Sequence, residues 1–223
     1  MTRGTLHMEN QMVEDLSTLA FIAPNLPRYE VDKEKFWAWW HEVSIPIARL
    51  TRDSRGNGQG WDGELWNGLT IWQKQDYQKT IVWKVNHQAN DELFGELIER
   101  VHKELPWYDI QGLTLWSNKI FIGAHHDGLP RDHFPSAPRI ALLDECENDT
   151  FFLVNRKTIK RSYPNLRTGS NLFLFNNEDF VHGADAPIGG KKVLIRVDGP
   201  LKDPEGLQKY IREQLEQGAK HGF

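Results

Sequence analysis

Two histidines and an aspartate directly follow an apolar stretch in the sequence IFIGAHHDG, residues 120–128. His125 and Asp127 are two positions apart, so on an extended chain their side chains face the same side, while His126 faces the other. One imidazole and one carboxylate on the same side provide two ligands for a divalent metal ion. The stretch therefore predicts part of a metal site at the end of a strand.

A third ligand has to come from another part of the chain, and the candidate is His182. It lies 55 residues after Asp127, in the sequence FNNEDFVHGADAP, behind an expected strand at 171–175. Two histidines and one carboxylate on one face of an octahedral metal leave three positions open for other ligands. Non-haem iron(II) oxygenases use this arrangement, so the three residues together indicate an iron(II) site.

A different set of metal ligands is the alternative at this point. His125, His126 and His133 could form a cluster with His182, as in a metal-dependent isomerase or a zinc-binding module. Neighbouring residues on a regular strand point in opposite directions, so His125 and His126 cannot easily bind one metal ion. This favours Asp127 as the partner of His125.

Two cations lie in a strand-like segment after His182, in the sequence KKVLIRVDG. Lys192 and Arg196 are four positions apart, so both face the same side as Leu194. Arg196 lies within an apolar run, where an unpaired charge is costly, and this predicts a partner for it. That partner is either a bound carboxylate or, structurally, Asp198. For Lys192 the alternative to a binding role is a solvated position at the start of the strand.

In this order of residues the sequence resembles the Fe(II)/2-oxoglutarate-dependent oxygenase superfamily. Members have the pattern His-x-Asp, a second histidine several tens of residues later, and then a basic residue on a following strand. The resemblance covers residues 113–199. In detail, APRIALLDECENDTFFLVN, GSNLFLFNNEDFVHG and KKVLIRVDG are similar to the aspartyl/asparaginyl β-hydroxylase-like branch of that superfamily.

The resemblance implies a catalytic centre in which His125, Asp127 and His182 bind Fe(II). It implies 2-oxoglutarate and dioxygen as co-substrates, because members use both. The distal carboxylate of 2-oxoglutarate then needs a cation, and Arg196 is expected to hold it, with Lys192 as the alternative. Arginine is preferred because its forked guanidinium can form a bidentate salt bridge with a carboxylate.

The resemblance further implies a dioxygenase that hydroxylates an unactivated C–H bond of a free amino acid or a similar small polar metabolite. Members of the same branch act on free amino acids such as proline. A hydroxylase of protein or peptide side chains is one alternative, and a non-oxidative, metal-binding, cupin-like protein is another. Arg139, Asn118 and Trp116 are the candidate substrate-binding residues, since they flank the strands expected around the metal site.

The elements that must position these residues follow from hydrophobic periodicity and turn residues. Helices are expected at 33–50, 91–105 and 205–217, and strands at 69–72, 80–85, 113–123, 139–143, 150–155, 171–175 and 192–197. Helices followed by a run of short strands predict an α+β protein. Its core is expected to be a double-stranded β-helix, the jelly-roll or cupin-like fold, with the N-terminal helices packed outside.

The 223 residues suit a single domain. We expect a mobile leader at 1–25, a helical and mixed support at 26–112, the jelly-roll core at 113–199 and a C-terminal helix at 200–223. The net charge of −4 argues against a nucleic-acid partner. The single cysteine, Cys146, excludes an internal disulfide and fits a cytoplasmic protein. No apolar stretch approaches the roughly 18 residues that a membrane span needs, so no membrane association is expected.

Overall fold

The structure is a computed structural model, and it describes residues 19–42, 66–74, 91–118, 120–126, 138–177 and 179–221. At 66–69, 91 and 221 it describes the backbone but not the side chains. Several sequence-based predictions lie outside the described residues. They are the third metal ligand Asp127, the alternative ligand His133, the second half of the helix expected at 33–50 and the strand expected at 80–85.

Antiparallel strands form two sheets in the described part of the chain. The strands are β1 (Phe21–Ala23), β2 (Trp66–Gln73), β3 (Gly112–Asn118), β4 (Ile122–His125), β5 (Arg139–Asp144), β6 (Phe151–Asn155), β7 (Arg161–Ser162), β8 (Leu172–Phe175), β9 (Phe180–Ala184), β10 (Lys192–Asp198) and β11 (Lys220–His221). The large sheet has the order β11-β1-β8-β5-β10-β3-β2, and the small sheet has the order β4-β9-β6-β7. Strands that follow one another in sequence thus alternate between the sheets through most of the core.

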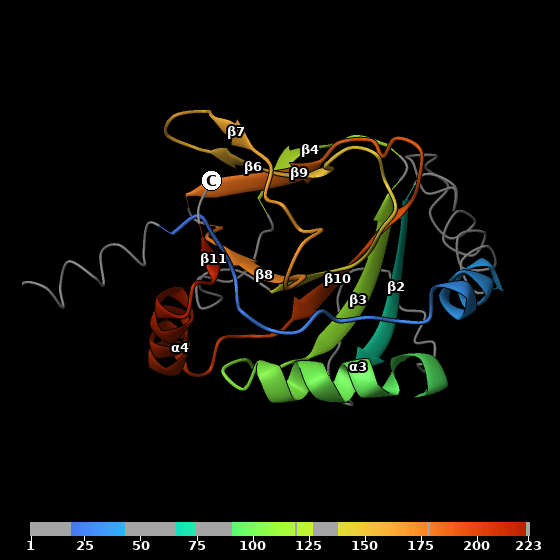
Figure 1. Ribbon diagram of the computed structural model, residues 1–223, viewed down its shortest axis with the longest axis horizontal. Coiled ribbons are helices and arrows are strands. Elements are labelled where there is room, and N and C mark those ends of the chain that lie inside the picture. Colours follow the sequence, from blue (N-terminus) through green and yellow to red (C-terminus); the bar gives the residue numbers. More distant parts are fainter. Residues whose placement is uncertain are drawn as a thin grey trace, which may run out of the picture.

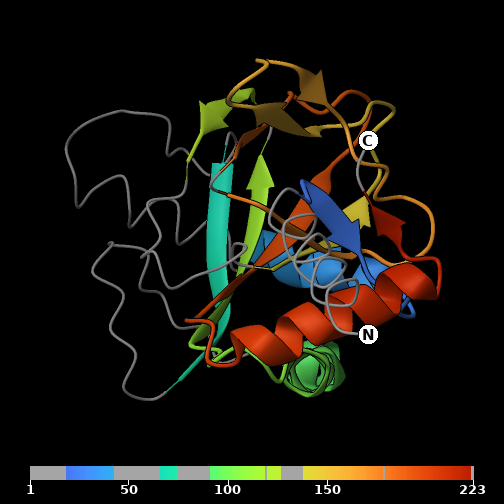
Figure 2. The same ribbon diagram turned by 90° about the vertical axis from the view of Figure 1, so that its left-hand side faces the viewer.

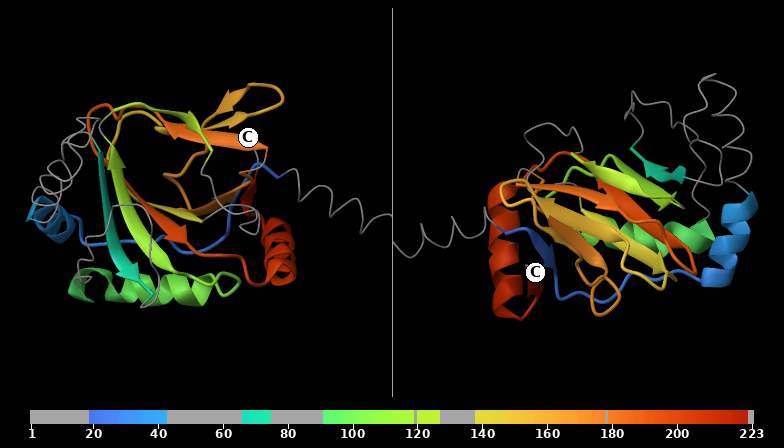
Figure 3. Two further views of the ribbon diagram at one scale, coloured as in Figure 1. Left: turned by 180° about the vertical axis from the view of Figure 1, so that it is seen from behind. Right: turned by 90° about the horizontal axis from the view of Figure 1, so that it is seen from above.

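The small sheet lies over one face of the large sheet, and the helices lie on the opposite face (Figure 1). These helices are α3 (Asp91–Glu104) and α4 (Pro204–Glu216), and residues 33–42 are also helical. The view in Figure 2 shows α3 and α4 crossing below the large sheet, and Figure 3 shows the small sheet from above. Two facing antiparallel sheets with helices outside confirm the predicted α+β jelly-roll fold. No helix in the described part of the chain is long and apolar enough to cross a membrane.

Alternation along the strands of the large sheet separates two packed regions. On β10, Val193, Ile195 and Val197 point to the outer face, where they join the buried cluster that includes Phe94 of α3. We define the inner face as the face toward the small sheet. Leu194 points to this face and packs against a second buried cluster, which includes Phe151 and Phe173. Because side chains alternate, every second residue of β10 faces the space between the sheets.

Three sequence-based boundaries are corrected by the structure. The single strand expected at 113–123 is two strands, β3 and β4, which belong to different sheets. The leader expected at 1–25 is too long, because β1 pairs with β8 inside the large sheet. The large sheet also includes β2, which lies in the helical and mixed support expected at 26–112 and before the core expected at 113–199. Apolar composition predicts a strand but does not reveal a turn within it or its partner.

The hairpin between β6 and β7 contains a β-branched residue in the left-handed conformation. Ile159 has a φ of 57° and is 73% exposed. Its amide donates to the carbonyl oxygen of Asn155 at 2.8 Å, and the Asn155 amide donates to that of Lys160 at 3.0 Å, which closes the turn. A left-handed conformation costs an L-residue roughly 1–2 kcal/mol. Ile159 therefore stores strain in an exposed turn.

Replacing Ile159 with glycine is expected to raise the free energy of unfolding by about 1 kcal/mol, because glycine adopts this φ without strain. For a chain of this size the melting temperature should rise by about 2–4 °C. The matched control is Ile188→Gly, since Ile188 is also an exposed loop isoleucine but has no positive φ. Calorimetric melting of both variants tests this. An equal or lower melting temperature for Ile159→Gly would contradict the assignment of strain.

Candidate metal and co-substrate site

His125 and His182 lie side by side on neighbouring strands of the small sheet. They are directly opposite one another in the pairing of β4 with β9, and their ring centroids are 4.4 Å apart. His182 lies near the middle of β9, where Leu153 of β6 is its partner on the other side. The sequence did not predict β9, so the strand that carries the second histidine is a finding of the structure.

A β-bulge turns His125 to the face that His182 occupies. In the pairing with β9, Ile122 is opposite Ala184 and His125 is opposite His182, so three steps on β4 match two steps on β9. Without the extra residue, Ile122 and His125 would point to opposite faces of the sheet. Bulges of this kind commonly re-aim a side chain next to a functional site. Here the bulge is the local reason that the two imidazoles meet.

The surroundings of the two imidazoles fit a metal site. Nδ1 of His125 lies 2.9 Å from the carbonyl oxygen of Gly123, which is within hydrogen-bond distance. A ring nitrogen that donates to a backbone carbonyl fixes the tautomer and leaves Nε2 as the metal-binding atom. His182 is 7% exposed and packs near Phe151 and Phe175, with ring centroids 6.0 and 5.0 Å away. This packing holds its ring in place.

Two imidazoles are the ligands that the described residues contribute. No group of three or more His, Cys, Asp and Glu side chains suited to a metal ion occurs within the described ranges. Asp127, the expected carboxylate ligand, lies outside them, two residues after His125. The described residues thus provide two facing histidines, one at the end of β4 and one in β9, which suit iron(II) as part of a two-histidine, one-carboxylate site.

Gly183 is a positioning residue that the sequence analysis did not identify. A Cβ atom at this position would lie 2.4 Å from Cζ of Phe152 and 2.6 Å from the carbonyl oxygen of Ile122. Any larger residue would therefore push β4 or Phe152 away from β9. Because Gly183 follows His182 directly, the close approach of β4 that brings His125 to His182 depends on this glycine.

Arg196 lies on the inner face of the large sheet, as predicted from its alternation with Leu194. Its guanidinium is paired with Asp198, with Nε 2.8 Å from Oδ1 and Nη2 3.4 Å from Oδ2, and its Cζ lies 5.3 Å from the centroid of the Trp116 ring. Directly opposite it on β3 is Thr114, a buried hydroxyl. The structure thus contains the salt bridge that sequence reasoning offered as the structural alternative, and it adds a hydroxyl beside the arginine.

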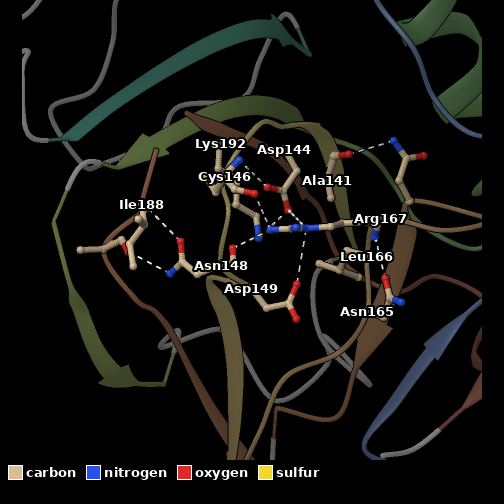
Figure 4. A network of polar contacts seen from close by, with 12 residues as sticks. Ala141, Asp144, Cys146, Asn148, Asp149, Asn165, Leu166, Arg167, Ile188 and Lys192 are labelled. Atoms are coloured by element: carbon tan, nitrogen blue, oxygen red, sulfur yellow. Dashed lines mark hydrogen bonds and ion pairs between the residues drawn. The ribbon is translucent and has the colours of Figure 1, made fainter. Parts of the chain in front are cut away.

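Lys192 belongs to a separate network of buried charges (Figure 4). Its Nζ lies 3.6 Å from Oδ2 of Asp144, and both side chains are less than a tenth exposed. Arg167 approaches the same carboxylate, with Nε 3.6 Å from Oδ2, and donates to the carbonyl oxygens of Cys146 and Asn148 at 2.7 Å each. Burial lowers the pKa of Lys192, an effect that Asp144 opposes. The solvated position considered for Lys192 is wrong, because the residue is buried.

The three candidate substrate-binding residues occupy different environments. Arg139 is buried at the start of β5, and its Cζ lies 5.8 Å from the centroid of the Phe175 ring. Trp116 lies on the inner face beside Arg196. Asn118, the last residue of β3, donates to the carbonyl oxygen of Ile120 at 2.9 Å. The structure therefore brings Arg139 and Trp116 toward the space between the sheets and gives Asn118 a role in the turn before β4.

Comparisons with known proteins found no matching family model and no matching curated protein. Matching solved structures include an oxidoreductase of the 2OG-Fe(II) oxygenase family from Burkholderia pseudomallei, at 9% identity and a TM-score of 0.43, covering 79% of this chain and 98% of that one. A prolyl-4-hydroxylase from Pseudomonas putida matches at 13% identity and a TM-score of 0.39, covering 85% of this chain and 97% of that one. A prolyl hydroxylase from Trichoplax adhaerens, in complex with a peptide fragment of the hypoxia inducible factor oxygen degradation domain, matches at 14% identity and a TM-score of 0.40. It covers 93% of this chain and 97% of that one.

These likenesses are too distant to assign an activity or a substrate to this chain. Two of the three structures are prolyl hydroxylases, and none is described as an aspartyl/asparaginyl hydroxylase. The resemblance of the sequence to that particular branch therefore gains no support from them.

Proposed function

We propose that this protein is an Fe(II)- and 2-oxoglutarate-dependent dioxygenase. The observation that carries the proposal is the facing pair of His125 and His182, which a bulge in β4 and a glycine in β9 bring together. Asp127 follows His125 by two residues and would complete the ligand set. On the opposite sheet, Arg196 supplies a cation for the distal carboxylate of a 2-oxo acid.

The roles of the chain's own residues follow from this arrangement. His125, Asp127 and His182 would hold the iron on one side and leave the other side open. When bound, the iron supplies the activation of dioxygen that protein side chains cannot perform. Arg196 would orient the co-substrate from the inner face of the large sheet, while Phe151 and Phe175 exclude water around His182.

Arg196 is preferred to Lys192 as the co-substrate's partner because of the exposure of the two side chains. The Arg196 side chain is 21% exposed, whereas that of Lys192 is 4% exposed. Lys192 is enclosed with Asp144, and Arg167 adds a second cation to that carboxylate. A ligand can reach the partly exposed guanidinium without opening an internal ion pair. Desolvated pairs of this kind are costly to break.

The substrate that we propose is a free amino acid or a similar small polar metabolite. The inner face of the large sheet supports this, because it carries Arg139, Arg196 and Thr114 in addition to apolar side chains. A peptide substrate is the second candidate. It is favoured by Ile120 and Phe121, apolar residues that are 39% and 56% exposed immediately before β4.

Succinate formation from 2-oxoglutarate tests the proposal. The purified protein would be incubated in air with Fe(II) and 2-oxoglutarate, against a panel of free amino acids and short proline- or asparagine-containing peptides. Iron-dependent succinate that rises with an amino acid is the expected result, and stimulation by peptides alone would select the second candidate. If no sample exceeds the iron-free control and 2-oxoglutarate does not bind, the protein is a non-oxidative metal-binding protein instead.

A further inference from the structure

Two arginines face one another across neighbouring strands of the large sheet. Arg139, the first residue of β5, is the direct cross-strand partner of Arg196 on β10. Both lie on the inner face, because Ala141 and Leu194, two residues away on each strand, pack in the cluster between the sheets. Directly opposite residues have Cβ atoms about 5 Å apart, so the two guanidinium groups can reach a common ligand.

This arginine pair lies at the end of the sheet nearest the histidines. The Arg139 guanidinium lies 5.8 Å from the centre of the Phe175 ring, and the same ring lies 5.0 Å from that of His182. The Phe175 ring thus lies near both Arg139 and His182. Lys192 is paired with Asp144 at the other end of β5, about 13 Å from the arginine pair along β10.

The chemistry of the pair suits a carboxylate. Asp198 contacts Arg196 through Nε and Nη2, so the Nη1 side of this guanidinium points away from Asp198. Like charges directly opposite one another in a sheet repel, and a carboxylate that bridges them reduces the repulsion. Thr114, opposite Arg196 on its other side, adds a hydroxyl to the same row.

We infer that Arg139 and Arg196 together bind the distal carboxylate of the 2-oxo acid co-substrate. The inference rests on the proposed function and extends it. From the sequence, a residue of β10 alone was expected to bind this carboxylate, and Arg139 was expected to bind the substrate. Arg139 takes part because the register of β5 against β10 places it next to Arg196, on the same inner face of the large sheet.

Binding of 2-oxoglutarate without oxygen tests the inference directly. Calorimetric titration of the Fe(II)-loaded protein would compare wild type, Arg139→Gln, Arg139→Lys and, as a control, Arg161→Gln, which changes an exposed arginine of β7. Arg139→Gln should weaken binding roughly ten- to a hundredfold. Arg139→Lys should lose less, because it keeps the charge without the fork. The control should bind like wild type.

Pyruvate separates a binding role from a structural one, because it is a 2-oxo acid without a distal carboxylate. Wild type should prefer 2-oxoglutarate to pyruvate, and Arg139→Gln should lose most of that preference while its pyruvate affinity stays the same. Equal loss for both acids in the Gln and Lys variants would show a structural role and overturn the inference. An unchanged 2-oxoglutarate affinity with a higher KM for substrate would also overturn the inference, because it would show that Arg139 binds the substrate instead.

The outcomes also separate this inference from the proposed function. If wild type binds 2-oxoglutarate and both Arg139 variants bind it equally well, the inference is wrong and the proposed function stands. If wild type does not bind 2-oxoglutarate at all, the proposed function fails and the inference fails with it.

Discussion

Replacing His125 with alanine is expected to abolish iron-dependent turnover, with a loss of iron affinity on the order of a hundredfold or more. Even residues that only hydrogen-bond to metal ligands change affinity by about 10–100-fold, so removal of a ligand should cost at least as much. The fold should survive, because the His125 side chain is exposed and lies at the end of an edge strand. Iron content after dialysis and succinate formation measure the two effects.

The adjacent histidine provides the matched control. His126 is also exposed, follows directly on β4 and has the same chemistry, but alternation turns it away from His182. His126→Ala should therefore keep one Fe(II) per chain and full turnover, whereas Asp127→Ala should behave like His125→Ala. Loss of iron in His126→Ala with retention in Asp127→Ala would replace the carboxylate site by the histidine cluster considered as its alternative.

Local sequence pattern was enough to predict most of the elements around this site. Alternation and turn residues placed β5, β6, β8 and β10 within one or two residues, because each is a short apolar run bounded by polar turns. The same alternation correctly put Lys192, Leu194 and Arg196 on one side of a strand. Strand positions and side-chain alternation depend on residues that are close together in the sequence, so a single sequence is enough to predict them.

The relations between elements could not be predicted in this way. The bulge in β4 depends on pairing with β9, a strand whose residues FVHGA give little strand signal because two of the five are small. The need for Gly183 arises from Phe152 and Ile122, which lie at least 31 residues away in the sequence. The pairing of Arg139 with Arg196 is likewise a matter of register between distant strands. A single sequence carries no direct signal for any of these contacts.

Buried ion pairs were the other feature that sequence left open. The sequence offered two roles for each of Lys192 and Arg196, and the structure pairs each with an aspartate. Asp198 was a foreseeable partner, since it is two residues from Arg196 on the same strand. Asp144 was not, because it meets Lys192 only through the pairing of β10 with β5. The two cations therefore need an experiment that separates binding from stability.

Substituting leucine for Arg196 and for Lys192 is expected to affect different properties most strongly. Arg196→Leu should raise the 2-oxoglutarate requirement roughly ten- to a hundredfold, because a charge-assisted pair contributes about 1.5–3 kcal/mol. Lys192→Leu should instead destabilise the fold by about 3 kcal/mol, since it removes one partner of a buried ion pair. Arg167 stays within 3.6 Å of Asp144, which limits this loss. Apparent 2-oxoglutarate affinity and thermal unfolding would be measured on both variants.

The two readouts distinguish the roles because the cations lie at different ends of β10, about 13 Å apart along the strand. Arg196→Lys supplies a further control, since it keeps the charge facing Asp198 while removing the fork that grips a carboxylate. It should bind 2-oxoglutarate more weakly than wild type and melt close to it. A large loss of affinity in Lys192→Leu with none in Arg196→Leu would reverse the assignment and make the Asp144 network the co-substrate site. If neither variant changes the affinity, a strand other than β10 holds the distal carboxylate, or 2-oxoglutarate is not the co-substrate.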